Sequence, residues 1–386
     1  MINRFTDKYY FLNNFYETPI EYGGATYSNA EAAFQAQKTA DENERRQFAD
    51  MSAEAAKKRG REVFLRPDWE QVKAEIMYEV CLAKFTQNDI LKEKLLATGH
   101  EMLIYGNDNG DTLWGQADGI GENLLGKCLM RIRDELMYCR KEGSFDPAQT
   151  KEGIIRWIRE YMAFNGNDET KAVIGISGGK DSTVAAALAA EALGRDRVVG
   201  VLMPRGVQPD IEDSYRVVRH LGIQYYEVNI GNAADELLKA VNGIALSEQA
   251  KVNTPPRIRM TTLYAVAACV GGRVMNTCNL SEDFVGYSTK FGDSAGDFSP
   301  LANLTVAEVI EVGKLLDIPT ELVVKPPSDG LCGKTDEDNL GFSYADLDRF
   351  IRLGRNALSD KDTIRCIEEL HIRNLHKLSA LPVFEK

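Results

Sequence analysis

A short loop in the second half of the chain has the composition of an anion-binding site. The segment Ser177-Gly178-Gly179-Lys180-Asp181-Ser182 follows an apolar run and precedes a helix-like one. Its two glycines let backbone N–H groups close on an anion, and the helix N-terminus adds the positive end of its dipole. A Walker A loop would need Ser or Thr where Asp181 stands, and an aspartate there offers oxygen to Mg²⁺. The structural alternative is a strand–turn–helix with small residues for close packing.

A carboxylate in the first half, Glu31, is the candidate for acid–base chemistry there. It lies in the run Tyr27-Ser28-Asn29-Ala30-Glu31, just before Phe34-Gln35-Ala36-Gln37-Lys38. Ser28 and Glu31 also have the S-x-x-E spacing of a capping box, so the structural alternative is that Glu31 caps its own helix. On that alternative, Trp69 belongs to the core and Lys38 lies on a solvated helix face.

The elements that would position these residues follow two different patterns. In the first half, short aromatic segments and a turn at Gly23-Gly24 precede helices expected at 29–40, 52–59, 68–85 and 88–97, which predicts a mainly helical α+β domain. In the second half, strands expected at 172–176, 198–203 and 224–228 alternate with helices at 182–193 and 210–221. That alternation predicts an α/β domain with a doubly wound parallel sheet.

Gly143, Ser144 and Pro147 separate the two patterns, and Pro147 suits the first turn of a new helix. We therefore expect two domains, at 1–143 and 144–386. A length of 386 residues also fits more than one domain.

The composition excludes several classes of protein. Hydrophobic residues make up 44% of the chain and charged residues 27%, as in globular proteins, and the net charge of −12 argues against a general nucleic-acid binder. Seven scattered cysteines without a C-x-x-C pair indicate reduced thiols, with neither a disulfide framework nor a zinc site. The first residues lack the apolar core of a signal peptide, and no apolar stretch approaches the length of a membrane span. We expect a soluble, cytoplasmic protein.

The loop resembles that of the ATP-pyrophosphatase (PP-loop) superfamily, with its adenine nucleotide α-hydrolase-like fold, whose members cleave ATP between the α and β phosphates. From about residue 147 onward the chain is similar to ammonia-dependent NAD synthetases. The matching motifs are Arg257-Ile258-Arg259-Met260, Thr277 with Glu282, Gly286 to Asp293 with Asp297 and Pro300, Lys325-Pro326-Pro327-Ser328, and His376-Lys377. Other PP-loop enzymes are the alternative, although the tRNA-thiolating ones commonly pair a catalytic cysteine with another.

The resemblance implies roles for individual residues. The ATP-binding residues would be Gly175, Ser177, Gly178, Gly179, Lys180, Asp181, Ser182, Thr277 and Ser328. Mg²⁺ would be bound by Asp181 and Glu282, and deamido-NAD by Arg257, Lys290, Asp297, His376 and Lys377. The implied reaction is amidation of deamido-NAD through an acyl-adenylate, with ammonia from solution or a partner, in a homodimer.

Two positions depart from the synthetase pattern. Val306 stands where the family has a phosphate-binding lysine, and Leu202 stands where it has an arginine near ATP. Loss of a phosphate-binding cation would weaken ATP binding or slow adenylation unless Lys180 or Arg205 substitutes for it. We expect an active enzyme.

Residues 5–137 resemble the NADAR family of N-glycosidases. The matches are Phe11 to Tyr16, Glu31 with Phe34 to Lys38, Gly60-Arg61, Asp68 to Glu70, Val72-Lys73, Met77, Lys84-Phe85, Leu95 to Thr98, Asp111, Trp114-Gly115, Asn123 to Gly126, Met130 and Arg133. The family cleaves N-glycosidic bonds to ribose in riboflavin-pathway intermediates, and some members remove ADP-ribose from guanine. Ala32 stands where the family usually has histidine.

That resemblance makes Glu31 and Asp111 the candidate catalytic carboxylates, for stabilising an oxocarbenium-like transition state or activating water. Trp69 and Trp114 would form walls for a base or ribose, and Asn123, Lys38 and Arg61 would contact phosphate or ribose hydroxyls. The implied substrate is an N-ribosyl nucleotide. The alternatives are removal of ADP-ribose from guanine and a non-catalytic sensor of ADP-ribose or NAD.

Overall fold

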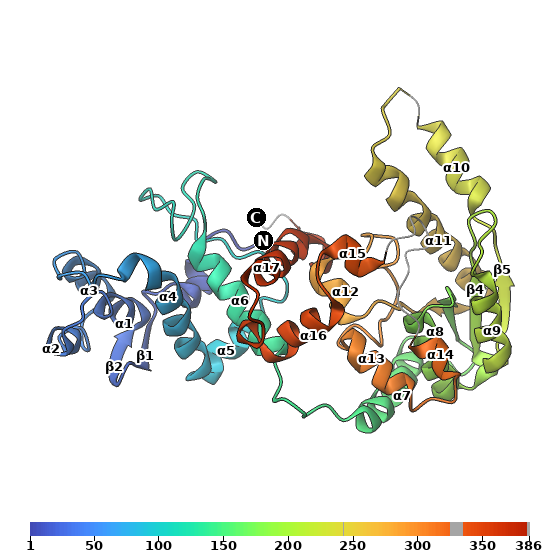
Figure 1. Ribbon diagram of the computed structural model, residues 1–386, viewed down its shortest axis with the longest axis horizontal. Helices are drawn as coiled ribbons and strands as arrows, with labels where there is room; N and C mark the ends of the chain where they lie inside the picture. The colour runs from blue at the N-terminus through green and yellow to red at the C-terminus, as the bar shows by residue number, and fades with distance from the viewer. Residues whose placement is uncertain (242, 325–334, 384–386) are drawn as a thin grey trace. The chain divides into compact units, whose positions relative to one another are not determined.

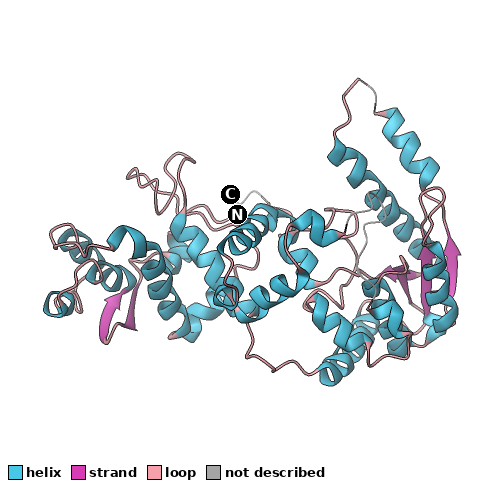
Figure 2. Cartoon of the chain, viewed as in Figure 1, coloured by secondary structure: helices cyan, strands magenta, loops and turns pink. Residues whose placement is uncertain are grey.

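The computed structural model describes residues 1–241, 243–324 and 335–383. Its contacts divide the chain into two compact units (Figures 1 and 2). The first unit comprises Met1–Cys139 with the segment that begins at Leu378, and the second comprises Arg140–Lys377. No helix within the described ranges is both long and apolar enough to cross a bilayer.

The first unit is mainly helical, as the sequence predicts. It opens with a 3-10 helix and a two-stranded antiparallel hairpin, which turns at Gly23 and Gly24, both with positive φ. The hairpin strands are β1 (Glu17–Tyr22) and β2 (Ala25–Asn29). The helices that follow are α1 (Ala30–Ala36), α2 (Glu42–Arg46), α3 (Ala53–Arg59), α4 (Trp69–Thr86), α5 (Asp89–Leu96) and α6 (Leu124–Tyr138).

Helix α1 is buried along its whole length, between the hairpin, α3 and α4. The side chains of its four alanines are small, so neighbouring elements can approach the helix closely. The helix is shorter than the predicted 29–40, because the chain leaves helical geometry after Gln37, the C-cap. Burial of Glu31 and Gln35 in such a helix carries a desolvation cost, which points to a functional reason for keeping them.

The second unit is built on a parallel sheet in the order β5-β4-β3-β6. Its strands are β3 (Lys171–Gly175), β4 (Val198–Leu202), β5 (Gln224–Glu227) and β6 (Gly272–Val274). This topology confirms the predicted α/β fold. Because parallel strands share one carboxyl edge, the loops after β3, β4 and β6 meet there, which is where such sheets bind ligands.

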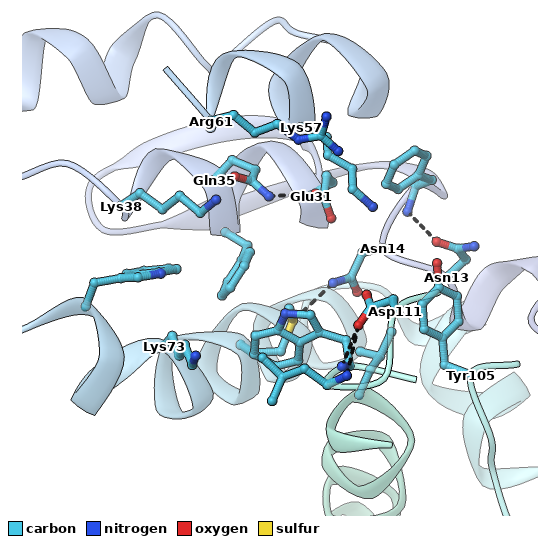
Figure 3. Close-up of a pocket in the computed structure, with 17 residues that line it drawn as sticks. Asn13, Asn14, Glu31, Gln35, Lys38, Lys57, Arg61, Lys73, Tyr105 and Asp111 are labelled. Atoms are coloured by element: carbon cyan, nitrogen blue, oxygen red, sulfur yellow. Dashed lines mark hydrogen bonds between the residues drawn. The ribbon is translucent and has the colours of Figure 1, made fainter. Parts of the chain in front are cut away.

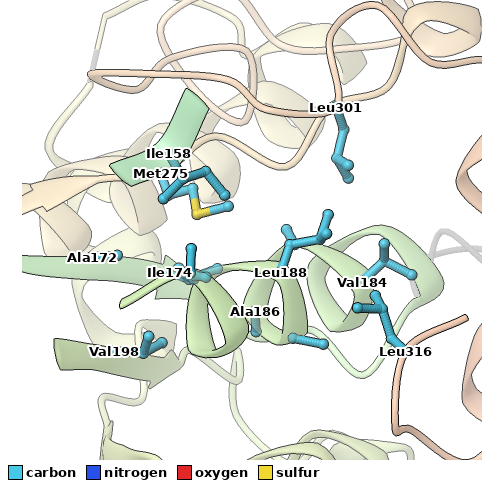
Figure 4. Packing of buried hydrophobic residues seen from close by; sticks show 14 of the residues in the cluster. Ile158, Ala172, Ile174, Val184, Ala186, Leu188, Val198, Met275, Leu301 and Leu316 are labelled. Atoms are coloured by element: carbon cyan, nitrogen blue, oxygen red, sulfur yellow. The ribbon is translucent and has the colours of Figure 1, made fainter. Parts of the chain in front are cut away.

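Helices cover both faces of this sheet. On one face, α7 (Pro147–Phe164) and α8 (Lys180–Leu193) pack through a cluster that includes Ile158, Ile174 and Leu188 (Figure 4). On the other face, α11 (Glu248–Val270) packs against Val173, Val201 and Val274. The other helices are α9 (Ile211–Leu221), α10 (Gly231–Ala240), α12 (Leu280–Val285), α13 (Val306–Gly313), α14 (Thr320–Val323), α15 (Asp336–Leu340), α16 (Tyr344–Leu353) and α17 (Lys361–Leu378).

Candidate active sites

The first unit contains a cavity of about 300 Å³ that brings together most of the residues singled out in that half (Figure 3). The sequence-predicted residues that line it are Glu31, Lys38, Arg61, Trp69, Asp111 and Trp114. They come from α1, the segments after α1 and α3, the start of α4 and the loop before α6. Residues far apart in the sequence thus form one polar cavity with aromatic sides.

Glu31 does not cap its own helix. Asn29 is the N-cap of α1, and its side chain accepts a hydrogen bond from the Ala32 amide at 2.8 Å. Ser28 donates its hydroxyl to the Ala49 carbonyl instead. The capping-box alternative is therefore wrong, and the Glu31 side chain lines the cavity. Burial raises the pKa of Glu31, against the hydrogen bond from Gln35, which lowers it.

Aromatic rings form one side of this cavity. The ring centroid of Phe34 lies 5.2 Å from that of Trp69 and 5.3 Å from that of Trp114. Lys38 Nζ lies 5.9 Å from the Trp69 ring centroid, and burial lowers the pKa of this lysine. Such a wall offers flat apolar faces for a planar base or the carbon face of a ribose.

The other predicted polar residues are held differently. Asp111 Oδ1 accepts hydrogen bonds from the amides of Leu113 and Trp114, so one carboxylate oxygen also orders the turn that carries Trp114. Asn123 is absent from the cavity lining: its amide bridges the backbone of Leu103 and Tyr105. The expected contact of Asn123 with phosphate or ribose is thus replaced by a structural role.

Two further cations, Lys57 and Lys73, line the cavity, and neither was among the candidate residues. Lys57 lies four residues before Arg61, a spacing that places both on one side of α3 and its continuation. Lys73 lies four residues after Trp69 in α4. Helical spacing from a predicted site residue was one available signal for both lysines, and Lys73 also belongs to the NADAR matches. A lysine at that spacing, however, more often faces water.

In the second unit, hydroxyl groups close the glycine loop between β3 and α8. Ser177 Oγ and Ser182 Oγ lie 3.1 Å apart, and Ser177 Oγ accepts from the Gly179 amide at 3.2 Å. Gly178 has φ +78°, and a Cβ there would lie 2.8 Å from Asp213 Cβ. Glycine is therefore needed at 178 for both its conformation and its lack of volume.

Two predicted metal ligands, Asp181 and Glu282, belong to one electrostatic cluster. The Asn279 side chain donates to Asp181 Oδ1 at 3.1 Å and accepts from the Glu282 amide at 3.0 Å. Burial and the charge of Asp181 raise the pKa of Glu282 well above its ordinary value. Lys180 Nζ lies 2.9 Å from Asp181 Oδ2; burial opposes its charge, but Asp181 and Glu282 raise its pKa overall.

Sequence reasoning missed Asn279, which is fully buried and touches both carboxylate residues. Its signal was its position three residues before Glu282, the spacing of an N-cap. Within the described part of the chain, no three or more His, Cys, Asp or Glu side chains are arranged as a metal site. The carboxylates of Asp181 and Glu282 nevertheless fit Mg²⁺, because a hard cation favours oxygen ligands and relieves repulsion between them.

The remaining predicted ATP ligands lie at different places. Thr277 follows β6, so it lies at the same sheet edge as the glycine loop. Ser328 lies outside the described residues. Val306, where the resemblance expects a lysine, is 8% exposed, and its amide donates to Ser281 Oγ at 3.0 Å. A lysine at position 306 would lie in the first turn of α13, where the native side chain is buried.

Four of the five predicted deamido-NAD ligands gather around the loop after α12. Arg257 Nε donates to the Lys290 carbonyl at 3.2 Å, and Lys290 Nζ donates to the His376 carbonyl. Lys377 Nζ donates to the carbonyls of Gly286 and Ser288 at 2.6 and 2.8 Å. Asp297 is held elsewhere.

Asp297 Oδ2 accepts from the Val274 amide at 2.7 Å, and Oδ1 accepts from the Tyr264 hydroxyl at 3.3 Å. Asp297 therefore joins β6 to α11 through these two hydrogen bonds.

Residues 151–380 match the model of the NAD synthase family, and residues 2–137 match that of the NADAR domain. The NH(3)-dependent NAD(+) synthetase of Pyrococcus furiosus is 42% identical over 201 residues, covering 52% of this chain and 77% of that protein. The enzyme of the same name from Pyrococcus horikoshii is 38% identical over 247 residues, covering 60% and 95%.

Solved structures agree with this assignment. The NMN synthetase of Francisella tularensis is 33% identical with a TM-score of 0.57, covering 62% of this chain and all of that one. The NH3-dependent NAD synthetase of Campylobacter jejuni is 26% identical with a TM-score of 0.52, covering 63% of this chain and all of that one. The chain belongs to the NAD synthase family and carries a NADAR domain ahead of its synthase segment.

Proposed function

We propose that the second unit amidates deamido-NAD to NAD, using ATP and ammonia through an acyl-adenylate. The observation that carries this proposal is the Ser177–Ser182 loop at the carboxyl edge of the sheet, next to the Asp181 and Glu282 carboxylates, in a chain of the NAD synthase family. We further propose residues 144–386 as the synthetase domain and residues 1–143 as the NADAR domain.

In the proposed reaction, the nicotinate carboxylate attacks the α-phosphate of ATP and pyrophosphate leaves. Backbone N–H groups of the loop, the N-terminus of α8 and Lys180 would stabilise the departing pyrophosphate. Asp181 and Glu282 would hold Mg²⁺, which neutralises charge on the phosphates. Ammonia then displaces AMP from the acyl-adenylate, so the protein mainly orients and neutralises its substrates.

Lys180 is the residue we propose in place of the family's lysine, because it is buried beside Asp181, whereas Val306 is apolar. Replacing Lys180 by methionine should raise the KM for ATP, while Lys239→Met, on the exposed part of α10, serves as the control. An unchanged KM for ATP in Lys180→Met would remove Lys180 from this role.

A second candidate substrate is the nicotinate mononucleotide, whose amidation gives NMN. Likeness to the Francisella tularensis NMN synthetase favours it. The two candidates are separated by kcat/KM for the mononucleotide and for deamido-NAD under the same ATP, Mg²⁺ and ammonia concentrations. A higher kcat/KM for deamido-NAD supports the first proposal, and a higher value for the mononucleotide supports the second.

We also propose that the first unit hydrolyses an N-ribosidic bond of a nucleotide-like metabolite. The supporting observation is the cavity that joins Glu31 and Asp111 with the Phe34, Trp69 and Trp114 rings. Burial raises the pKa of the Glu31 carboxyl, which favours its protonated form and suits it to a role as general acid. The ring wall would hold the base while the carboxylates stabilise the cationic ribose.

Glu31→Gln separates this proposal from the two alternatives given above. With a panel of N-ribosyl nucleotides, a hydrolase should lose release of reducing ribose by about 10²- to 10⁴-fold in this variant. A sensor would release none in either protein and would keep ligand-dependent control of NAD synthesis. ADP-ribosylated guanine in the same panel tests the remaining alternative.

The resemblance to NAD synthetases also leads us to propose a homodimer. Light scattering on the purified chain should give about twice the mass of 43.0 kDa. A fully active monomer would contradict this part of the proposal.

A further inference from the structure

A buried glutamine stands behind the candidate carboxylate of the first unit. Gln35 lies four residues after Glu31 in α1, so the two side chains share one side of the helix. Gln35 Nε2 donates to Glu31 Oε1 at 2.8 Å, and both residues line the cavity (Figure 3). Gln35 is 6% exposed and Glu31 7%, so solvent competes little with this hydrogen bond.

Gly60 leaves the space that the Gln35 amide fills. A Cβ on Gly60 would lie 1.9 Å from Gln35 Oε1 and 2.8 Å from its Cδ. The backbone of Gly60 is ordinary for any residue, with φ −63° and ψ −6°. Volume, and not conformation, therefore ties glycine at this position to the place of the Gln35 amide: a larger residue would displace the amide. The Gly60 carbonyl also accepts a hydrogen bond from Lys38 Nζ at 3.1 Å.

The oxygen atom of the Gln35 amide, Oε1, is buried and lacks a hydrogen-bond donor among the described residues. An unpaired buried acceptor carries a free-energy cost. A half-turn of the amide exchanges its two polar atoms, and Oε1 can then accept from a protonated Glu31. Gln35 thus offers a partner to both protonation states of Glu31.

We propose that Gln35 is a positioning residue of this site: its amide holds Glu31 Oε1, presents Oε2 to the substrate, and depends on the absent side chain at Gly60. A general acid or base must act as both acid and conjugate base within one cycle, so a partner for both states keeps its geometry constant. An effect of Gln35 on turnover rests on the glycosidase function proposed above, whereas its hydrogen bond to Glu31 does not.

Several charged groups act on the Glu31 carboxylate besides Gln35. Lys57 in α3 and Lys38 after α1 lower its pKa, and Asp111 in the loop before α6 raises it. The Tyr105 hydroxyl also faces this charge, since burial and then Asp111 and Glu31 raise its pKa. Loss of the Gln35 hydrogen bond removes a contribution that favours the ionised form. Glu31 should then titrate at higher pH while these other groups stay in place.

The titration of Glu31 can be measured without any substrate. The full chain, labelled with [5-¹³C]glutamate, gives carboxyl resonances by NMR, and the Glu31 signal is the one missing in Glu31→Gln. We expect Gln35→Met to move its midpoint to higher pH. Gly60→Ala should do the same by displacing the amide, and the double variant should add nothing to Gln35→Met, because Gly60 acts through Gln35.

Gln37→Met is the matched control. Gln37 is also 6% exposed and lies at the end of the same helix, but its amide points to the Ala33 carbonyl and it does not line the cavity. Its variant should leave the Glu31 midpoint unchanged. An unmoved midpoint in both Gln35→Met and Gly60→Ala, or an equal shift in Gln37→Met, would overturn the proposal.

Kinetics give the second readout. On any N-riboside that the parent hydrolyses, Gln35→Met should lower kcat by about tenfold, the typical worth of a hydrogen bond to a charged group, with KM nearly unchanged. Its pH–rate profile should shift with the NMR midpoint. A shifted midpoint without turnover of any substrate rejects the glycosidase and keeps the positioning role. Turnover of an N-riboside by the parent, with an unshifted Glu31 midpoint in the variants, rejects the positioning role and keeps the glycosidase.

Discussion

At the scale of single residues, each candidate site has a carboxylate held by a neighbouring amide. Gln35 donates to Glu31 in the first unit, and Asn279 donates to Asp181 in the second. In both places the amide comes from a buried residue, 6% and 0% exposed. Such partners fix the direction of a charged oxygen before a ligand arrives, which is what electrostatic catalysis requires.

Replacing Asn279 by alanine should affect both stability and ATP use. The variant loses the N-cap of α12, worth about 1 kcal/mol, and the hydrogen bond to Asp181. We expect a lower free energy of unfolding and a KM for ATP raised several-fold in NAD-synthesis assays. Ser247→Ala removes the exposed N-cap of α11 and should change stability alone. Equal KM values for the two variants would contradict the positioning of Asp181 by Asn279.

Lys84 should make the free energy of unfolding depend on pH in the alkaline range. It is buried, it donates to the Asn13 carbonyl at 2.7 Å, and burial lowers its pKa from 10.5 to about 8. Between these pH values the unfolded chain binds more protons than the native one, so stability should rise with pH by up to about 3 kcal/mol. Lys84→Met should lack this rise.

Urea unfolding of the parent and of Lys84→Met at pH 7.5, 9 and 10.5 gives the difference between their free energies of unfolding at each pH. The contributions of the other titrating groups cancel in this difference. A gap between parent and Lys84→Met that stays constant with pH would show that Lys84 keeps an ordinary pKa.

At the scale of elements, the glycine loop and the strands before it could be predicted because their signals are local. Apolar runs bounded by glycine and charge placed β3, β4 and β5 within one residue of their observed ends. The strand β6 has three residues, too few to show a period. Whether Lys57 faces water or a cavity depends on packing between distant segments, which one helix cannot reveal. The same limit hid the role of Asn123.

Gly178→Ala tests the loop as an element. The variant meets both an unfavourable φ and the side chain of Asp213, so the loop must move. Gly194→Ala, at the other end of α8, meets the unfavourable φ of +83° with nothing within 4 Å of its Cβ.

We expect both variants to lose about 1 kcal/mol or more of stability, but only Gly178→Ala to raise the KM for ATP, by tenfold or more. Calorimetry and steady-state kinetics measure the two effects. Comparable KM values in the two variants would mean that the loop does not contact ATP.

At the scale of the whole molecule, the chain is acidic overall but gathers cations at particular places. The net charge is −12, yet Lys38, Lys57, Arg61 and Lys73 all line one cavity of the first unit. The second unit gathers Arg257, Lys290 and Lys377 around one loop. Local arrangement, and not net charge, therefore decides what each unit attracts.

Because each unit has its own set of candidate residues, the two activities should be separable. Asp181→Asn should abolish NAD synthesis and leave ribose release from N-ribosides unchanged, and Glu31→Gln should do the reverse. Both reactions can be followed in one purified sample by chromatography of the nucleotides. Loss of both activities in either variant would show that the two sites depend on each other.

The most direct test of the synthetase incubates the full chain with ATP, Mg²⁺, ammonia and deamido-NAD. A mechanism through an acyl-adenylate predicts NAD, AMP and pyrophosphate in equal amounts, with no product when ammonia and deamido-NAD are both omitted. Formation of ADP and phosphate, or consumption of ATP without NAD, would contradict the proposed reaction.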